Sequence, residues 1–359
     1  GNDEDWKIRV HVFVIGILVT IATYYTGKEL YDADVGLMAS ALSSVMFMLV
    51  EFSISARGYI IITLIYLVLI ILINRMKTQA NRRGWLIIGL LSGLGFLVSL
   101  AFLYPMGTLV VWAAVSILIE NKGQLRRRIF LYFTGSMILG ALLTAVYYIL
   151  ALVITFDSWE EFNTSYIMEL AQSLDYQYLV SVIIPKTARV VFWYTHMGMS
   201  SLIIMMCVFG VFIATIFHYK LSKNRFPIIV ATVVSVSVQI LVQQSDIFQR
   251  VFTFLTPIYA ILIAAGLITL VRFVTRDRIS QFYIAIFLSL IMCVPITYQL
   301  ISQEVLPHAG ITGYMRNADG IAKMIQETLE PGDYLLSDFT SAKLVGYYLW
   351  RNNSDIKVN

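Results

Sequence analysis

Long apolar runs separated by short polar segments dominate the chain. Most of these runs are about 16–25 residues long, close to what a helix needs to cross the hydrocarbon core of a bilayer. They cover residues 10–26, 35–52, 59–74, 85–103, 105–119, 129–155, 199–218, 226–243, 251–272 and 280–301. Because apolar residues are continuous in them rather than alternating, the runs predict about ten membrane-spanning helices and not the strands of a barrel.

Two runs carry further information on geometry. Only Tyr104 and Pro105 separate the fourth run from the fifth. Proline lacks the backbone donor that a continuous helix needs, so this pair predicts a tight hairpin. The run 129–155 is longer than a simple crossing requires, and we expect it to tilt or to project beyond the bilayer.

Composition agrees with an all-α polytopic membrane protein. Hydrophobic residues make up 58% of the chain and charged residues 13%, with a mean hydropathy of +0.77. Soluble domains have about 25% charged residues. Cys207 and Cys293 lie inside apolar runs and are predicted to be buried thiols rather than a disulfide framework. The four histidines lack metal-ligand spacing, the sequence has no glycine-rich phosphate loop, and no nucleic-acid partner is expected.

Basic residues concentrate in alternate loops, although the formal net charge is only +4. The basic set comprises Lys28, Arg75, Lys77, Arg82, Arg83, Lys122, Arg126, Arg127, Arg128, Lys220, Lys223, Arg225, Arg272, Arg276 and Arg278. Basic loops remain on the cytoplasmic side, so this set predicts the cytoplasmic face. The opposite loops, the amino terminus and the C-terminal region are then predicted to face outward.

Two outward segments are long. Residues 156–198 carry aromatic and aliphatic residues at helical spacing, which predicts an amphipathic helix on the outer leaflet or a structural loop packed on the bundle. Residues 303–359 contain a helix-like stretch at 317–329, a strand candidate at 334–337 and a second helix at 341–350. We therefore expect a transmembrane domain over 1–302 and part of a small extracytoplasmic α/β domain over 303–359.

A polar motif from Glu51 to Tyr59 lies between two apolar runs. An ionisable group at such a junction is a functional hypothesis by default. The alternative is an ordinary loop in which Arg57 anchors to lipid headgroups.

Several short motifs accompany it in a definite order along the chain. They are Tyr24–Lys28 (YYTGK), Gly36–Ser40 (GLMAS), Ser53–Tyr59 (SISARGY), Arg250–Pro257 (RVFTFLTP), Gly332–Tyr334 (GDY) and Tyr347–Leu349 (YYL). Their order and spacing resemble those of polytopic glycosyltransferases with the GT-C fold, in the branch of the protein O-mannosyltransferases and aminoarabinose transferases.

This resemblance implies an enzyme of a bacterial or archaeal cytoplasmic membrane. It would transfer a sugar from a polyprenyl-phosphate carrier to a lipid, glycan or protein on the outer face, in contact with membrane lipids and further membrane subunits. Arg57, with Tyr59 beside it, is the first candidate for binding the donor phosphate, because arginine is permanently charged and bonds two oxygens at once. Arg250 is the second candidate, and an interfacial anchor is its alternative role.

Other candidates rest on weaker signals. Lys186, Arg189 and His196 lie in the long outer segment, where surface charges and a membrane-facing histidine are the favoured interpretation. Glu51 is a candidate acid or an ion-pair partner for Arg57.

The family's catalytic acid belongs to a first outer loop that precedes the position of Trp6. The acidic cluster Asp3, Glu4 and Asp5 is on the predicted outer side but very close to the next span, so it is a weak candidate for the acid. Because the chain begins outward with no signal-like segment, we expect the natural protein to continue upstream with at least one more span. Some relatives bind a divalent cation, and no residue pattern here specifies one.

Two other functions compete with the transferase. A non-catalytic or degenerate GT-C-like subunit would explain the missing acid. A transporter of a lipid-linked substrate is less favoured, because the chain shows no convincing internal repeat and its polar residues gather on one face.

Overall fold

The computed structural model describes residues 5–55, 57–154, 181, 184–243, 249–275, 278–302, 318–329 and 345–349. The chain divides into two compact units, residues 1–300 and 301–359. Each unit is described by itself.

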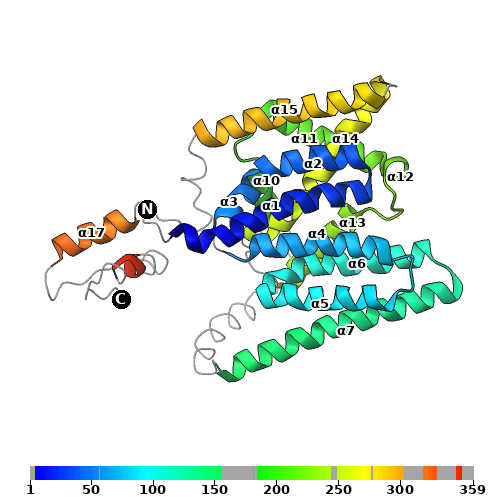
Figure 1. Ribbon diagram of the computed structural model, residues 1–359, viewed down its shortest axis with the longest axis horizontal. Helices are drawn as coiled ribbons and strands as arrows, with labels where there is room; N and C mark the ends of the chain where they lie inside the picture. The colour runs from blue at the N-terminus through cyan, green and yellow to red at the C-terminus, as the bar shows by residue number, and fades with distance from the viewer. Residues whose placement is uncertain are drawn as a thin grey trace. The chain divides into compact units, whose positions relative to one another are not determined.

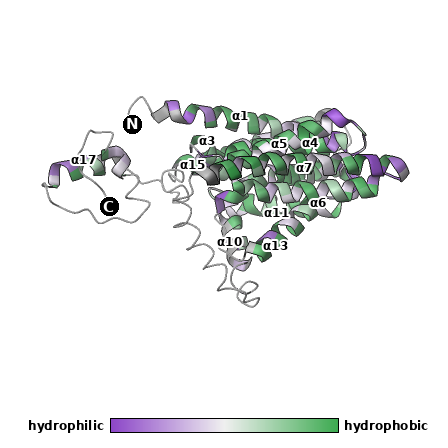
Figure 2. Ribbon diagram, turned by 90° about the horizontal axis from the view of Figure 1, so that it is seen from below, coloured by the Kyte–Doolittle hydropathy of each residue, from purple (hydrophilic) through white to green (hydrophobic). Residues whose placement is uncertain are grey.

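The first unit is a bundle of helices, and all regular structure within its described residues is helical (Figure 1). In chain order these are α1 (Asp5–Leu30), α2 (Ala33–Val45), α3 (Phe47–Ile54), α4 (Tyr59–Met76), α5 (Arg82–Val98), η1 (Leu100–Phe102), α6 (Leu103–Glu120), α7 (Gly123–Ile154), α10 (Ile184–Thr195), α11 (Ser201–Ile216), α12 (His218–Leu221), α13 (Ile228–Gln243), η3 (Gln249–Phe254), α14 (Leu255–Val274) and α15 (Arg278–Ser302). Apolar residues cover the long helices, with polar residues concentrated toward helix ends (Figure 2). This confirms the predicted all-α polytopic membrane architecture.

Each of the ten predicted runs coincides with helix, but fewer of them qualify as spans. Among the described residues, six helices are long and apolar enough to cross a membrane, or seven if the pair α2 and α3 counts as one broken span. That pair bends by 60° at Met46. The helices α11 and α13 are apolar but short. The candidate spans among the described residues are therefore fewer than the ten predicted, because a run of apolar residues does not reveal where its helix bends or stops.

The predicted hairpin at Tyr104-Pro105 was also misplaced. The helix α5 ends at Val98, and the reversal lies over Ser99 and η1, where the Ser99 hydroxyl accepts a hydrogen bond from the Ala101 N–H at 3.2 Å. Pro105 lies in the first turn of α6. The first N–H groups of a helix have no acceptor within it, so proline costs no hydrogen bond there.

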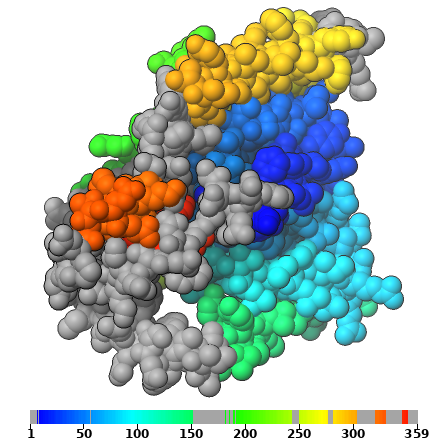
Figure 3. Space-filling model, turned by 60° about the vertical axis from the view of Figure 1, so that its left-hand side comes forward, coloured from blue at the N-terminus to red at the C-terminus, as the bar shows by residue number. Residues whose placement is uncertain are grey.

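The helix α14 forms the centre of the bundle. In its span, 83% of the residues are buried. It packs closely on α11 through Gly266 and Gly210, since a Cβ added to Gly266 would overlap the backbone of Gly210. Small residues allow such close approach in membrane bundles, where the apolar solvent gives no hydrophobic driving force between helices. The helix α15 lies on the flank of the bundle (Figure 3). Its side chains Phe287, Val294 and Tyr298 are exposed.

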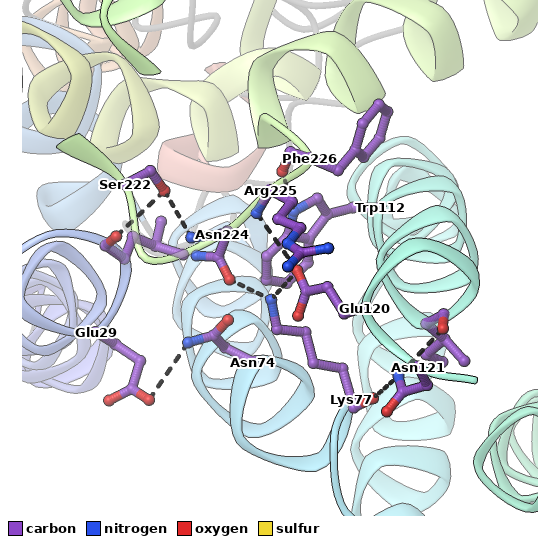
Figure 4. Close-up of polar contacts among 12 residues, drawn as sticks. Glu29, Asn74, Lys77, Trp112, Glu120, Asn121, Ser222, Asn224, Arg225 and Phe226 are labelled. Atoms are coloured by element: carbon purple, nitrogen blue, oxygen red, sulfur yellow. Dashed lines mark hydrogen bonds and ion pairs between the residues drawn. The ribbon is translucent and has the colours of Figure 1, made fainter. Parts of the chain in front are cut away.

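One end of the bundle is held together by ion pairs and hydrogen bonds between loops. The Lys77 ammonium pairs with the Glu120 carboxylate at 2.7 Å and also donates to the Asn224 amide oxygen (Figure 4). Elsewhere at this end, Arg272 pairs with Asp32 at 2.7 Å and with Asp34 at 3.0 Å.

These contacts join loops that are far apart in the sequence. The Lys223 ammonium donates to the Lys28 carbonyl at 2.8 Å, and Arg75 pairs with Glu29 at 3.3 Å. All five loops in the predicted cytoplasmic set are thus linked to one another or to neighbouring helix ends. We call this region the basic end of the bundle.

In the second unit, α17 (Ala318–Thr328) and a helical segment at 345–349 share a small core of Ala322, Ile325, Val345 and Leu349. The predicted strand at 334–337 lies outside the described residues.

Candidate functional site

The polar motif folds into a corner between two helices. The helix α3 ends at Ile54 and α4 begins at Tyr59, with Gly58 at its N-cap position. The Arg57 N–H donates to the Ser55 carbonyl at 2.6 Å, which tightens the connection. A Cβ at Gly58 would lie 2.7 Å from a Val98 methyl, so this corner is packed against the end of α5. The arginine and the tyrosine are therefore held on a short segment rather than on a long loop.

Arg250 joins this corner from a remote part of the sequence. It lies on η3, which packs on α3 and α4. The Arg250 guanidinium carbon is 6.0 Å from the centroid of the Tyr59 ring, within the range of a cation–π contact. The other neighbour of this ring is Phe52, at 5.3 Å between centroids. We call Glu51, Arg57, Tyr59 and Arg250 the arginine corner.

Arg57 and Arg250 both place a positive charge in this corner, and the charge of one affects the pKa of the other. Burial lowers the pKa of the Arg57 guanidinium, and the positive charge of Arg250 lowers it further, while Tyr59 and Glu51 act in the opposite direction. Arginine nevertheless stays protonated in proteins. Glu51 is only 4% exposed, so its carboxyl faces the interior of the bundle. Arg57 and Arg250 are thus two half-buried guanidinium groups that are close enough to repel each other.

The three weaker candidates belong to α10 and the turn after it. His196 is buried, contrary to the expectation of a membrane-facing side chain. Its Nδ1 donates to the Phe192 carbonyl at 2.7 Å, so its Nε2 accepts from the Tyr259 hydroxyl at 2.6 Å. Burial lowers the pKa of His196, against a smaller opposing effect of the hydrogen bond to Phe192. Arg189 is exposed, as expected for a surface charge, and the Lys186 side chain lies outside the described residues.

A cavity of about 500 Å³ lies between α10, α11, α13 and α14. Its wall is mainly aliphatic and aromatic, and the hydrogen-bonded pair His196 and Tyr259 adds a polar patch. Phe252, two residues after Arg250 on η3, also lines it. Sequence reasoning missed this cavity because its lining comes from four helices. The one local signal was Tyr259, a hydroxyl inside an apolar run.

Comparison with known proteins bears on the first part of the chain. Residues 1–149 match the family described as dolichyl-phosphate-mannose-protein mannosyltransferase. This match confirms the predicted resemblance to the GT-C glycosyltransferases. It includes Glu51, Arg57 and Tyr59, whereas Arg250 and His196 lie beyond it. No curated protein matches the chain.

Among solved structures, the chain is similar to the oligosaccharyltransferase of Archaeoglobus fulgidus, crystallised in complex with zinc and sulfate. The identity is 13% and the TM-score 0.45, over 90% of this chain and 44% of that one. The chain thus spans less than half the length of this relative.

The structure does not describe a site formed by the acidic candidates Asp3, Glu4 and Asp5, and it describes no metal site within its described ranges. Asp3 and Glu4 lie outside the described residues, and Asp5 is the first residue of α1. Within the described ranges, no three histidine, cysteine, aspartate or glutamate side chains are grouped so that they could hold a metal ion.

Proposed function

We propose that this protein is a membrane glycosyltransferase whose arginine corner binds the phosphate of a polyprenyl-phosphate sugar donor. The reaction would take place at the outer face and transfer the sugar to a lipid, glycan or protein. The observation that carries the proposal is that Arg250, about 190 residues further along the chain, reaches the Tyr59 ring and lies close enough to Arg57 to lower its pKa. The segment that carries Arg250 also contributes Phe252 to the wall of an apolar cavity.

The two arginines suit the chemistry of such a donor. When the bond between the anomeric carbon and the phosphate oxygen breaks, negative charge accumulates on the leaving phosphate. Fixed cations stabilise that charge more in the transition state than in the ground state, which lowers the barrier. A bound phosphate would reduce the repulsion between the two arginines, so the corner favours an anionic ligand.

The cavity between α10, α11, α13 and α14 suits the isoprenoid chain. Its wall is largely apolar, and Phe252 links it to the η3 segment that carries Arg250. Burial of a hydrocarbon chain there contributes affinity in proportion to the area removed from water or loosely packed lipid. The acceptor hydroxyl also needs a base, and we expect a carboxylate outside the described residues to supply it.

The test separates phosphate binding from folding. We expect Arg57→Gln to weaken binding of undecaprenyl phosphate at least tenfold, and a thermal unfolding curve shows separately whether the variant is folded. Arg126→Gln, an exposed arginine on α7 at the basic end of the bundle, is the matched control and should bind normally. Normal binding by Arg57→Gln would overturn the assignment.

Transfer is measured separately, with membranes that contain the protein and a labelled polyprenyl-phosphate sugar. Loss of transfer in Arg57→Gln, with transfer retained in Arg126→Gln, supports the enzyme. Binding that depends on Arg57 without any transfer by the natural protein would instead identify a non-catalytic subunit.

A further inference from the structure

A second groove lies on the outside of the bundle, between α1 and α4. Its volume is about 390 Å³, and its wall is almost wholly apolar. The residues that line it include Leu18, Ile21 and Tyr25 on α1 and Leu64, Val68 and Arg75 on α4. These positions recur every three or four residues and so form one stripe on each helix. We call it the α1–α4 groove.

The groove leads to the basic end of the bundle. Along α1, the stripe that contains Ile21 and Tyr25 continues to Lys28 and Glu29, one turn further on. Arg75 ends the stripe on α4, and its side chain is 55% exposed. Lys28 is exposed too, and the Lys223 ammonium donates to its carbonyl at 2.8 Å. Three cations thus stand at this end, with Glu29 as the carboxylate partner of Arg75 at 3.3 Å.

The length of the groove fits one leaflet of a membrane. Leu64 and Arg75 are eleven residues apart on α4, which corresponds to about 16 Å along a helix. One half of the hydrocarbon core is about 15 Å thick. A chain that starts at the level of Arg75 would therefore follow the groove to about the middle of the bilayer.

We propose that the α1–α4 groove is a binding site for an anionic glycerophospholipid of the leaflet at the basic end. One acyl chain lies in the groove, and the headgroup phosphate contacts Arg75 and Lys28. The ion pair of Arg75 with Glu29 is exposed and therefore weak, so the guanidinium can bond a phosphate oxygen as well. A net positive groove end selects an anionic headgroup over a zwitterionic one. This site is separate from the arginine corner and does not depend on the proposed activity.

Native mass spectrometry of the full chain with added lipid tests the site. The probes are dioleoyl-phosphatidylglycerol and dioleoyl-phosphatidylcholine, which share the same chains. We expect the protein to bind phosphatidylglycerol at least fivefold more tightly, and Arg75→Gln to remove this preference. Arg82→Gln, an exposed arginine at the start of α5 that does not line the groove, is the matched control.

A second variant tests the apolar part of the site. Val68→Trp fills the groove and leaves every charge in place, so it should weaken binding of phosphatidylglycerol while melting at the same temperature in lipid-free detergent. The proposal fails if Arg75→Gln and Arg82→Gln behave alike, or if a folded Val68→Trp binds phosphatidylglycerol as the natural protein does. Equal binding of both lipids by the natural protein would also overturn it.

Discussion

The roles of Arg57 and Arg250 can be interpreted only from their positions in the folded bundle. Each alone could be an anchor for lipid headgroups. Arg250 lies over the Tyr59 ring, and burial together with the charge of Arg250 lowers the Arg57 pKa, so we propose that the two arginines act as a pair that binds an anion. His196 shows the same effect, because its hydrogen bond to Tyr259 turns a predicted membrane-facing residue into part of a cavity wall.

Among the described residues, the buried histidines His196 and His218 predict an acid-sensitive fold. Burial lowers the pKa of His196 and of His218 below the ordinary 6.5. Below about pH 6.5, these histidines therefore bind protons in the unfolded chain but not in the folded chain. The free energy of unfolding consequently falls as the pH drops through this range. Thermal unfolding between pH 5 and 7.5 measures this slope. We expect His196→Asn to reduce the slope, and an unchanged slope in that variant and in His218→Asn would contradict the assignment.

The ion pair at the basic end predicts an asymmetric response to mutation. The Lys77 and Glu120 side chains are only 5% and 12% exposed. Glu120→Gln leaves a buried ammonium uncompensated and should cost about 3–5 kcal/mol of unfolding free energy. The double variant Lys77→Met, Glu120→Met removes both charges and should recover most of that loss. Denaturant titration in micelles measures both, and a double variant as unstable as Glu120→Gln would disprove the argument.

At the scale of the element, close helix contacts depend on glycine. The helices α11 and α14 touch at Gly210 and Gly266, and α14 is the most buried span of the bundle. A change in this contact would displace the helix that supplies Tyr259 to the cavity.

Gly266→Ala tests that contact. The added methyl group overlaps the Gly210 backbone, so we expect a loss of about 1–3 kcal/mol and a lower melting temperature. Gly135→Ala is the matched control, because nothing lies within 4 Å of a Cβ at that position on α7. The control should melt at the natural temperature or slightly higher, since alanine favours helix over glycine. Similar melting of both variants would show that the contact is not tight.

At the scale of the whole molecule, the basic end and the arginine corner define two faces. Loops with lysine and arginine are joined to one another at the first, and the second contains the motif that begins at Glu51. We propose that the basic end faces the cytoplasm, since the positive-inside rule places such loops there.

Cysteine labelling tests this orientation. In a background without Cys207 and Cys293, we expect Ser55→Cys to react with an impermeant reagent added from outside, and Arg126→Cys to react only after the membrane is opened. Placing the probe at Ser55 keeps Arg57 in place. Reaction of both positions from the same side would overturn the topology.

The sequence by itself determined the class of protein, the positions of the helices and the resemblance to GT-C glycosyltransferases. Continuous apolar runs, loop charge and motif order are local properties, so a single chain reveals them. They did not reveal that the run 35–52 bends by 60° at Met46, or that the reversal before α6 lies at Ser99. These depend on how each helix packs on its neighbours.

Tertiary structure alone decided which polar residues meet. Arg250 reaches Tyr59 because η3 packs on α3 and α4, and Tyr259 reaches His196 because α14 lies at the centre of the bundle. The same packing brings together the four helices around the cavity and places Arg75 at the end of the α1–α4 groove. The physical reason is that hydropathy determines which segments form helices in the membrane, whereas close packing between helices determines which side chains meet.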